Sequence, residues 1–171
     1  MIKLTPLFLF VSTLFFIGSL NLQAKAQDVV VTVTGDITNP YTMNTAAFAA
    51  MKQITVTANS KDGKSHQYSG VSLYDMVTKA GTVPNEQLRG KALSKYVLIT
   101  AADHYQVVIA LPEFDPAFTD QIIILANQED GHTLAAGTGP YRLIVPKDKR
   151  PARCVMQVTG IEVQTASPRK N

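Results

Sequence analysis

The sequence predicts an α+β domain in which short helices and strands follow one another in irregular order. Several short runs alternate apolar and polar residues with a period of two, which is the pattern of half-buried strands. Turn-forming pairs such as Asp62-Gly63 and Asp130-Gly131 separate these runs. Helix-like segments are few and do not follow every strand, so regular βαβ alternation is not expected.

The first elements are predicted between residues 28 and 51. Residues 28–34 are rich in Val and Thr, which favour strands, and residues 41–43 form a second, brief strand. Asn44 is suited to cap a helix over residues 45–51. This helix would direct three apolar side chains toward the core, those of Ala46, Phe48 and Met51.

A strand and a turn are strongly specified in the next stretch. Residues 54–58 alternate strictly, so Ile54, Val56 and Ala58 lie on one face of the predicted strand. The pair Asp62-Gly63 then provides a hairpin turn that requires a positive φ angle, and a second short strand follows it.

A capped helix completes this stretch. Ser72 precedes Asp75 by three residues, which is the spacing of a capping box. Gly81 follows the last apolar residues and is expected to end the helix in the left-handed conformation. This helix therefore has both a predicted start and a predicted end.

The second half of the mature chain contains further helical and extended segments. A polar helix capped by Asn85 extends to about Leu93, and a hairpin over residues 96–111 follows it, with a tight turn at residues 102–104. A helical turn is predicted over residues 112–115. Three strands come after it, over residues 121–126, 141–145 and 154–164. Residues 121–126 are continuously apolar, so this strand should be buried on both faces. The final strand changes the phase of its apolar residues at Gly160, which indicates a β-bulge.

An export signal is predicted at the N-terminus. Residues 7–22 are almost wholly apolar, Lys3 precedes them, and an A-x-A cleavage site ends at Ala26. Cleavage there would place residues 27–171 in the periplasm as a single domain, with its core at about residues 29–163. An uncleaved N-terminal anchor is the alternative that the length of the apolar run leaves open.

The mature chain carries a small and uneven charge. Without residues 1–26 the 16 basic residues fall by two, to 14, and exceed the 13 acidic residues by one. The net charge is +5 from Arg142 onward and −4 over residues 27–141. A general nucleic-acid-binding protein needs a broad basic face, so this class is not expected. A local anion site near the C-terminal end remains compatible with this distribution.

Cys154 is the only cysteine, so the chain cannot form an internal disulfide. The three histidines are scattered and show no H-x-x-x-H spacing, which excludes the usual structural zinc sites. Cys154 is expected on the apolar face of the final strand as a small buried hydrophobe, and a ligand or redox role is the alternative. The G-x-S-x-G, Walker A and G-x-G-x-x-G motifs are absent.

The ordered set of patterns resembles the molybdopterin-binding domain of the sulfite oxidase family. The segments that carry the resemblance are VTVTGDITNP, ITVTA, YSGVSLYDMVTKAG, AADHY, ILANQEDGHTL and GPYRLIVP, which together cover about residues 29–163. The resemblance implies an α+β fold with several β layers and an exported protein. In full members it also implies a molybdenum–pterin cofactor held by one cysteine thiolate.

The residue that would hold molybdenum departs from the family pattern. The position of the family's cysteine matches Ala58, or the following Asn59, and neither side chain can supply soft sulfur coordination. The basic residues that follow the cysteine in the family are also absent. No molybdenum cofactor is therefore expected, although the resemblance keeps molybdopterin binding open as the alternative.

Three further residues are candidates for the same pocket. His104 stands where family members often carry Gly, and it is either a turn residue or a ligand contact. Arg142 lies on an apolar strand and must reach an anionic ligand or an internal carboxylate such as Asp103 or Asp115. Arg150 belongs to the basic loop of residues 147–153, which is either solvated or holds a phosphate or pterin tail.

Three functions are compatible with these observations. The first is a non-catalytic exported member of the family that has lost molybdenum ligation and binds a small anionic ligand or a periplasmic protein partner. The second is a molybdopterin-dependent oxidoreductase whose site is atypical or completed by a partner chain. The third is a structural or adaptor domain. The missing thiolate in an otherwise complete scaffold favours the first, without association with nucleic acid or, after signal cleavage, with a membrane.

Overall fold

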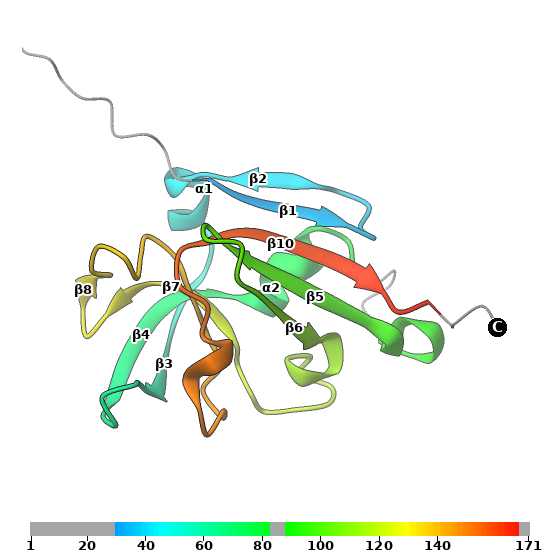
Figure 1. The fold of residues 1–171 in the computed structure, drawn as a ribbon. Helices are drawn as coiled ribbons and strands as arrows, with labels where there is room; N and C mark the ends of the chain where they lie inside the picture. Colours follow the sequence, from blue (N-terminus) through cyan, green and yellow to red (C-terminus); the bar gives the residue numbers. More distant parts are fainter. Residues whose placement is uncertain (1–29, 83–87, 168–171) are drawn as a thin grey trace, which may run out of the picture.

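Two five-stranded sheets form the framework of the protein. The computed structural model describes residues 30–82 and 88–167. Figure 1 shows β1, β2, β10, β5 and β6 across the upper part of the molecule and β3, β4, β7 and β8 below them. The predicted export signal and Asn85 lie outside the described residues. The α+β class with mixed β layers is confirmed.

The first sheet has the strand order β2-β1-β10-β5-β6. Its strands are β2 (Tyr41–Met43), β1 (Val31–Gly35), β10 (Val158–Thr165), β5 (Lys95–Ala101) and β6 (Gln106–Ala110). The pairing of β1 with β10 is parallel, and the other pairs are antiparallel. The predicted hairpin therefore exists as β5 and β6, and its turn places His104 at a φ angle of 68°.

The second sheet has the strand order β3-β4-β7-β8, with β9 also paired to β7. Its strands are β3 (Gln53–Asn59), β4 (Ser65–Ser72), β7 (Ile124–Glu129), β8 (His132–Thr133) and β9 (Arg142–Ile144). All of its pairs are antiparallel. The expected alternation in β3 is confirmed, because its odd-numbered residues are exposed and its even-numbered residues are partly or fully buried.

Short helices connect the strands. The helices are α1 (Thr45–Ala49), α2 (Leu73–Lys79) and the 3-10 helices η2 (Gly90–Ser94), η3 (Leu111–Glu113) and η4 (Pro151–Arg153). The side chain of Asn44 caps α1, and that of Ser72 caps α2 by accepting from the Asp75 N–H at 3.4 Å. Gly81 follows α2 at a φ of 71°, as predicted. None of the helices within the described ranges is long and apolar enough to cross a membrane.

The main core lies between the two sheets, to which β4, β7 and β9 contribute Val71, Leu125 and Leu143, and α1 and α2 add buried side chains to it. Its largest fully buried members include Phe48, Met43, Leu73, Met76 and Ile99. A second, smaller apolar cluster lies on one face of the second sheet and consists of Ala58, Tyr68, Ile124, Ala126 and Ile144. Burial of this apolar surface is the main contribution to stability, since the single cysteine is free.

Two predictions about apolar segments were wrong in detail. The run at residues 121–126 is not buried throughout, because β7 begins only at Ile124 and Ile122 is 50% exposed in the preceding loop. In α1, Ala46 is exposed and Phe48 is the buried residue. The helix is only five residues long, and its neighbour in the core is Tyr141, whose ring centroid lies 4.8 Å from that of Phe48.

Two predicted elements also begin later in the chain than expected. Residues 154–157 are not part of the last strand, because Gln157 has a φ angle of 49° and β10 starts at Val158. The bulge is confirmed by a register shift between Val158 and Gly160. The polar helix expected up to Leu93 is replaced in the described part by η2, since Gly90 has a φ angle of 56° and the two preceding residues are not helical.

Candidate functional site

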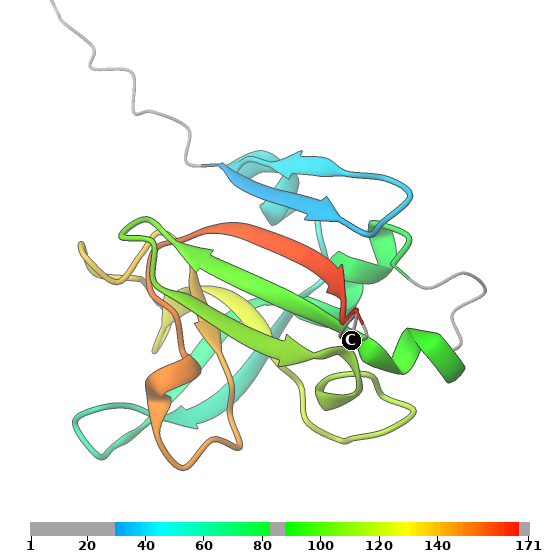
Figure 2. The same cartoon turned by 45° about the vertical axis from the view of Figure 1, so that its right-hand side comes forward.

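A cavity of about 650 Å³ opens between three loops that are distant in sequence. Lys61 comes from the turn between β3 and β4, and Asp103 and Tyr105 come from the end of the β5–β6 hairpin. Residues 150–152 and 154–157 form the third wall. In Figure 2 the orange segment that contains β9 and η4 runs between these two hairpins. The fold therefore assembles this cavity from loops that are each anchored on a sheet.

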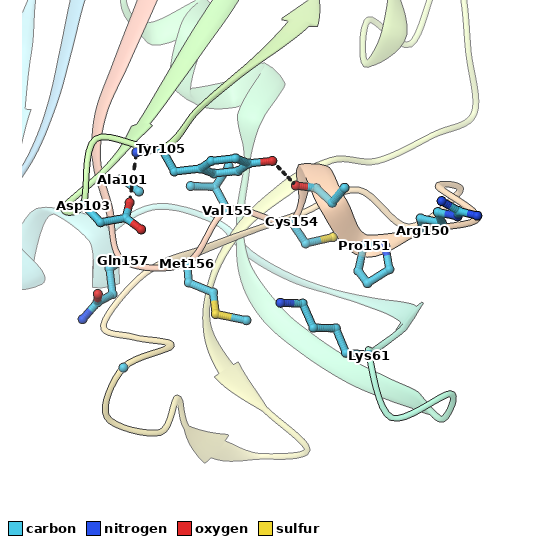
Figure 3. Close-up of a pocket in the computed structure, with 12 residues that line it drawn as sticks. Lys61, Ala101, Asp103, Tyr105, Arg150, Pro151, Cys154, Val155, Met156 and Gln157 are labelled. Carbon is cyan, nitrogen blue, oxygen red and sulfur yellow. Dashed lines mark hydrogen bonds between the residues drawn. The ribbon is translucent and has the colours of Figure 1, made fainter.

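The two ends of the cavity differ in charge. Figure 3 shows Asp103 and Gln157 on one side of the cavity, the Lys61 side chain reaching from the opposite side toward Met156, and Arg150 beyond Pro151 on that opposite side. Asp103 Oδ1 accepts the backbone N–H of Tyr105 at 2.9 Å, which holds the carboxylate in place. Within residues 30–82 and 88–167, neither Lys61 nor Arg150 forms an ion pair, so both cations are available to a bound anion.

Arg153, in contrast, is fully engaged inside the protein. Its Nε and Nη2 atoms donate to the two carboxylate oxygens of Asp148 at 2.8 and 2.7 Å, and Nη1 donates to Glu113 Oε2 at 2.8 Å. These contacts, first of all those with Asp148, hold the pKa of Arg153 above its ordinary value. Arg153 thus links η4 to η3. Of the two arginines in the basic loop, Arg153 has a structural role, whereas Arg150 forms no ion pair within the described residues.

Tyr105 forms a bridge across the mouth of the cavity. Its hydroxyl donates to the carbonyl oxygen of Ala152 at 3.0 Å, and its ring remains 49% exposed (Figure 3). The residue therefore links the β5–β6 hairpin to η4 while it offers an aromatic surface. Such a surface can contact a flat apolar ligand without a large loss of side-chain entropy.

Two sulfur-containing side chains also line the cavity. Figure 3 shows Cys154 and Met156 between Tyr105 and Lys61. Cys154 follows η4, rather than lying in the last strand, and its Sγ accepts the backbone N–H of Val145 at 3.4 Å. Burial raises the pKa of the Cys154 thiol, so it is held as a neutral thiol at neutral pH. Cys154 is 7% exposed, which confirms the expectation of a buried side chain. Its position in the wall of the cavity was not predicted from the sequence.

Arg142 is buried, and it forms no ion pair with a carboxylate of residues 30–82 or 88–167. It is 3% exposed, its Nη1 donates to the hydroxyl of Tyr68 at 3.3 Å, and its guanidinium carbon lies 5.3 Å from the centroid of that ring. Its Nε has no hydrogen-bond partner among the described atoms. The hydroxyl of Tyr68 in turn donates to Glu129 Oε1 at 2.7 Å. The expected internal pair of Arg142 with Asp103 or Asp115 is therefore not formed in the described part of the chain.

This arrangement predicts an energetic coupling between Arg142 and Tyr68. We expect Tyr68→Phe to lower the free energy of unfolding by about 2 kcal/mol, because it leaves the buried guanidinium without its acceptor. In the Arg142→Met variant, Tyr68→Phe should lower the free energy of unfolding by less than about 1 kcal/mol, because no buried charge remains to be satisfied. Urea denaturation followed by circular dichroism measures both values. Equal losses in the two backgrounds would contradict the coupling.

The five residues predicted for a ligand pocket do not gather at one place. They are Ala58, Asn59, His104, Arg142 and Arg150, and of these Arg150 lines the cavity. Ala58 is 5% exposed within the second apolar cluster, and the exposed Asn59 accepts from the Ser65 hydroxyl at 2.7 Å. His104 is an exposed turn residue beside two residues that do line the cavity. Cofactor binding by any of the five stays a prediction.

Sequence reasoning missed Lys61, Tyr105, Met156 and Gln157 as parts of one site. Tyr105 lies in the AADHY pattern and Lys61 next to a turn, but neither signal indicates which side chains face each other. The described residues contain no group of three or more His, Cys, Asp or Glu side chains that could hold a metal ion. The lining of the cavity offers charged, hydrogen-bonding and aromatic side chains.

Comparisons with known proteins identify a family and a related fold. Residues 18–171 match the family described as oxidoreductase molybdopterin binding domain. The crystal structure of the sulfane dehydrogenase SoxCD from Paracoccus pantotrophus is similar, with a TM-score of 0.63 and 18% sequence identity over 81% of this chain. The match covers 38% of the SoxCD chain, and at this identity it shows the fold alone. A search of curated proteins found no match.

Proposed function

Because the chain belongs to the oxidoreductase molybdopterin binding domain family, we propose that it is a member that has lost molybdenum ligation and binds a small anionic ligand. The observation that carries the proposal is the cavity, whose lining includes two cations, Lys61 and Arg150, that form no ion pair within the described residues. Its volume of about 650 Å³ lies in the range of small-molecule sites. The proposal includes export to the periplasm, with cleavage after Ala26.

The position of the family's cysteine does not fit a molybdenum centre. Ala58 carries a methyl group, which cannot coordinate a metal, and it packs with Ile124 and Ile144 in the second apolar cluster. The amide of Asn59 already accepts a hydrogen bond from Ser65. Since no thiolate occurs at this end of β3, no reaction step through molybdenum is assigned to the chain.

The lining of the cavity indicates the chemistry of the ligand. An anionic group would contact Lys61 and Arg150, while hydrogen-bond donors at the other end would face Asp103 and Gln157. A flat middle section would lie along Tyr105 and Met156. The ligand class is thus a compact molecule with an anionic tail, a flat middle section and hydrogen-bond donors at its other end.

A second candidate function rests on Cys154. This thiol lies in the wall of the cavity, so a molybdopterin-dependent oxidoreductase with an atypical site would have one sulfur ligand available there. Burial raises the pKa of this thiol, which opposes the role because a metal ligand must be deprotonated; the N–H that Val145 donates to Sγ acts in the opposite direction and does not outweigh burial. A partner chain that completes the site is the other form of this candidate.

Metal and pterin analysis separates the two functions. We expect the mature protein, purified from an exporting host supplied with molybdenum, to contain far less than one molybdenum atom per chain. A family member that retains the cysteine, produced in the same host, controls for cofactor supply. Stoichiometric molybdenum would overturn the proposed function. Its disappearance in Cys154→Ser would then assign the ligand, whereas retention would point to completion by another group.

A further inference from the structure

His66 on β4 is enclosed by carboxylates from two different turns. Its Nδ1 lies 2.7 Å from Asp130 Oδ2 and 3.7 Å from Glu129 Oε1, and its Nε2 lies 3.2 Å from Asp62 Oδ2. Both ring nitrogens therefore face acceptors that carry no proton at neutral pH. A neutral imidazole has one donor, so only the imidazolium can donate to Asp130 and Asp62 together.

The carboxylates are themselves held in position by backbone groups. Asp62 Oδ1 accepts the Lys64 N–H at 3.0 Å, and Asp130 Oδ1 accepts the Gln67 N–H at 2.9 Å. These hydrogen bonds, together with those from His66, keep the pKa of each carboxyl below its ordinary value. Both groups thus stay ionised well into the acidic range.

The other charged and titratable groups near His66 do not replace this interaction. They are Lys64 in the same turn as Asp62, His132 on β8, Glu129 on β7, and Tyr68, whose ring centroid lies 6.4 Å from that of His66 and which connects to Arg142. Glu129 Oε1 accepts from the Tyr68 hydroxyl, and it adds a third negative charge beside the imidazole. Every nearby carboxylate therefore favours the protonated ring.

This contact bears on the cavity because Asp62 is the neighbour of Lys61. The turn that carries both residues is held by its own hydrogen bonds, from Ser60 N–H to Lys64 O at 2.9 Å and from Gly63 N–H to Ser60 O at 3.1 Å. An added Cβ at Gly63 would meet no atom within 4 Å, so the turn projects into open space. The link through His66 to Asp130 is what ties the turn to the β7–β8 turn.

We propose that protonated His66 is a pH-dependent clamp that holds the β3–β4 turn, and with it Lys61, in the position that binds an anion in the cavity. The clamp rests on the proposed anion-binding function and adds its regulation. When His66 loses its proton, it can donate to only one carboxylate, so the link between Asp62 and Asp130 is broken while the hydrogen bonds within the turn remain. Lys61 then samples other positions, and the affinity for an anion falls.

The direction of the pH effect follows from the charges. The hydrogen bonds to Asp130 and then Asp62 raise the pKa of His66 above its ordinary value. The clamp is therefore fully closed below the ordinary histidine pKa and is lost as the pH rises through the raised value. Because the carboxylate pKa values are lowered, acid opens the clamp only at a pH below the ordinary carboxyl range.

The first test is structural and needs no ligand. We expect NMR titration of the mature protein to show His66 titrating above free histidine, and the protection factors of the amides in residues 60–64, which correct for the intrinsic base catalysis of exchange, to fall with the same midpoint. In His66→Asn these protection factors should be low at every pH, whereas His132→Asn, which changes another histidine near Asp130, should behave as wild type. Protection factors of these amides that stay high and independent of pH in wild type, or in His66→Asn, would overturn the clamp.

The second test measures binding of 2-naphthalenesulfonate, an aromatic anion whose charge is constant between about pH 5 and pH 9. We expect about tenfold weaker binding above the His66 transition, corresponding to the loss of one charge-assisted contact. His66→Asn should bind at the weak level throughout. Binding that is tight and independent of pH would overturn the clamp. No binding at any pH would contradict the anion site, and amide exchange would then still decide whether the clamp exists.

Discussion

The double variant Lys61→Gln/Arg150→Gln is expected to bind 2-naphthalenesulfonate about 100-fold more weakly than the wild-type protein at pH below the His66 transition. Each residue would lose one charge-assisted contact, and a loss of about 1.4 kcal/mol corresponds to a factor of ten. Neither cation has an ion-pair partner in the part of the chain that the structure describes, so their removal leaves no buried carboxylate behind. Fluorescence titration measures the dissociation constant.

A matched control comes from the same basic loop. Lys149 is exposed next to Arg150 but does not line the cavity, so Lys149→Gln should change the affinity by less than about twofold. If the two contacts are independent, the dissociation constant of each single variant, Lys61→Gln or Arg150→Gln, should lie near the geometric mean of the wild-type and double-variant values. An unchanged dissociation constant in the double variant, with wild-type thermal stability, would remove the main support for the proposed function.

The second large effect is expected at Gly70 on β4. A Cβ atom at this position would clash with the carbonyl oxygen of Leu125 and lie 2.6 Å from Cα of Ala126. Both are backbone atoms of the paired strand β7, at the register shift between Ser69 and Gly70, so neither can move without breaking the ladder. We therefore expect Gly70→Ala to lower the free energy of unfolding by at least about 3 kcal/mol in urea denaturation.

Gly160 provides the control for this substitution. It also lies at a register shift, but an added Cβ would be 3.7 Å from its nearest neighbours, Thr100 and Thr32. Gly160→Ala should therefore change the free energy of unfolding by less than about 1 kcal/mol. Similar losses of unfolding free energy in Gly70→Ala and Gly160→Ala would mean that both sheets can shift to accommodate a Cβ atom at these register shifts. Because β4 carries His66 and Tyr68, Gly70→Ala also tests whether the pairing of β4 with β7 is needed to hold these two side chains in place.

Elements with short-range signals were predicted well from the sequence. The alternation of β3, the cap formed by Ser72, and the left-handed Gly81 after α2 all occur in the structure. Each depends on groups within a few residues of one another, such as a hydroxyl and an N–H three positions away. The ordered set of these signals also led to the correct family.

Predictions failed where contacts between distant segments decide the conformation. Cys154 was expected in the last strand, yet residues 154–157 run beside β9, where the Leu143 N–H donates to the Val155 carbonyl at 2.8 Å. For Arg142 the sequence left an anionic ligand or an internal carboxylate as partner, and pairing of β9 with β7 places its guanidinium over the Tyr68 ring. Apolar periodicity records which residues are buried and carries no information on the partner strand.

The sequence by itself determined the α+β class and the family, because these depend on local patterns and on their order along the chain. The tertiary structure alone decided that Lys61, Tyr105 and Arg150 share a cavity and that Arg153 does not contribute a free charge to it. Two cations in one loop look alike in sequence. Only the position of Asp148 and Glu113 neutralises one and leaves the other open to a ligand.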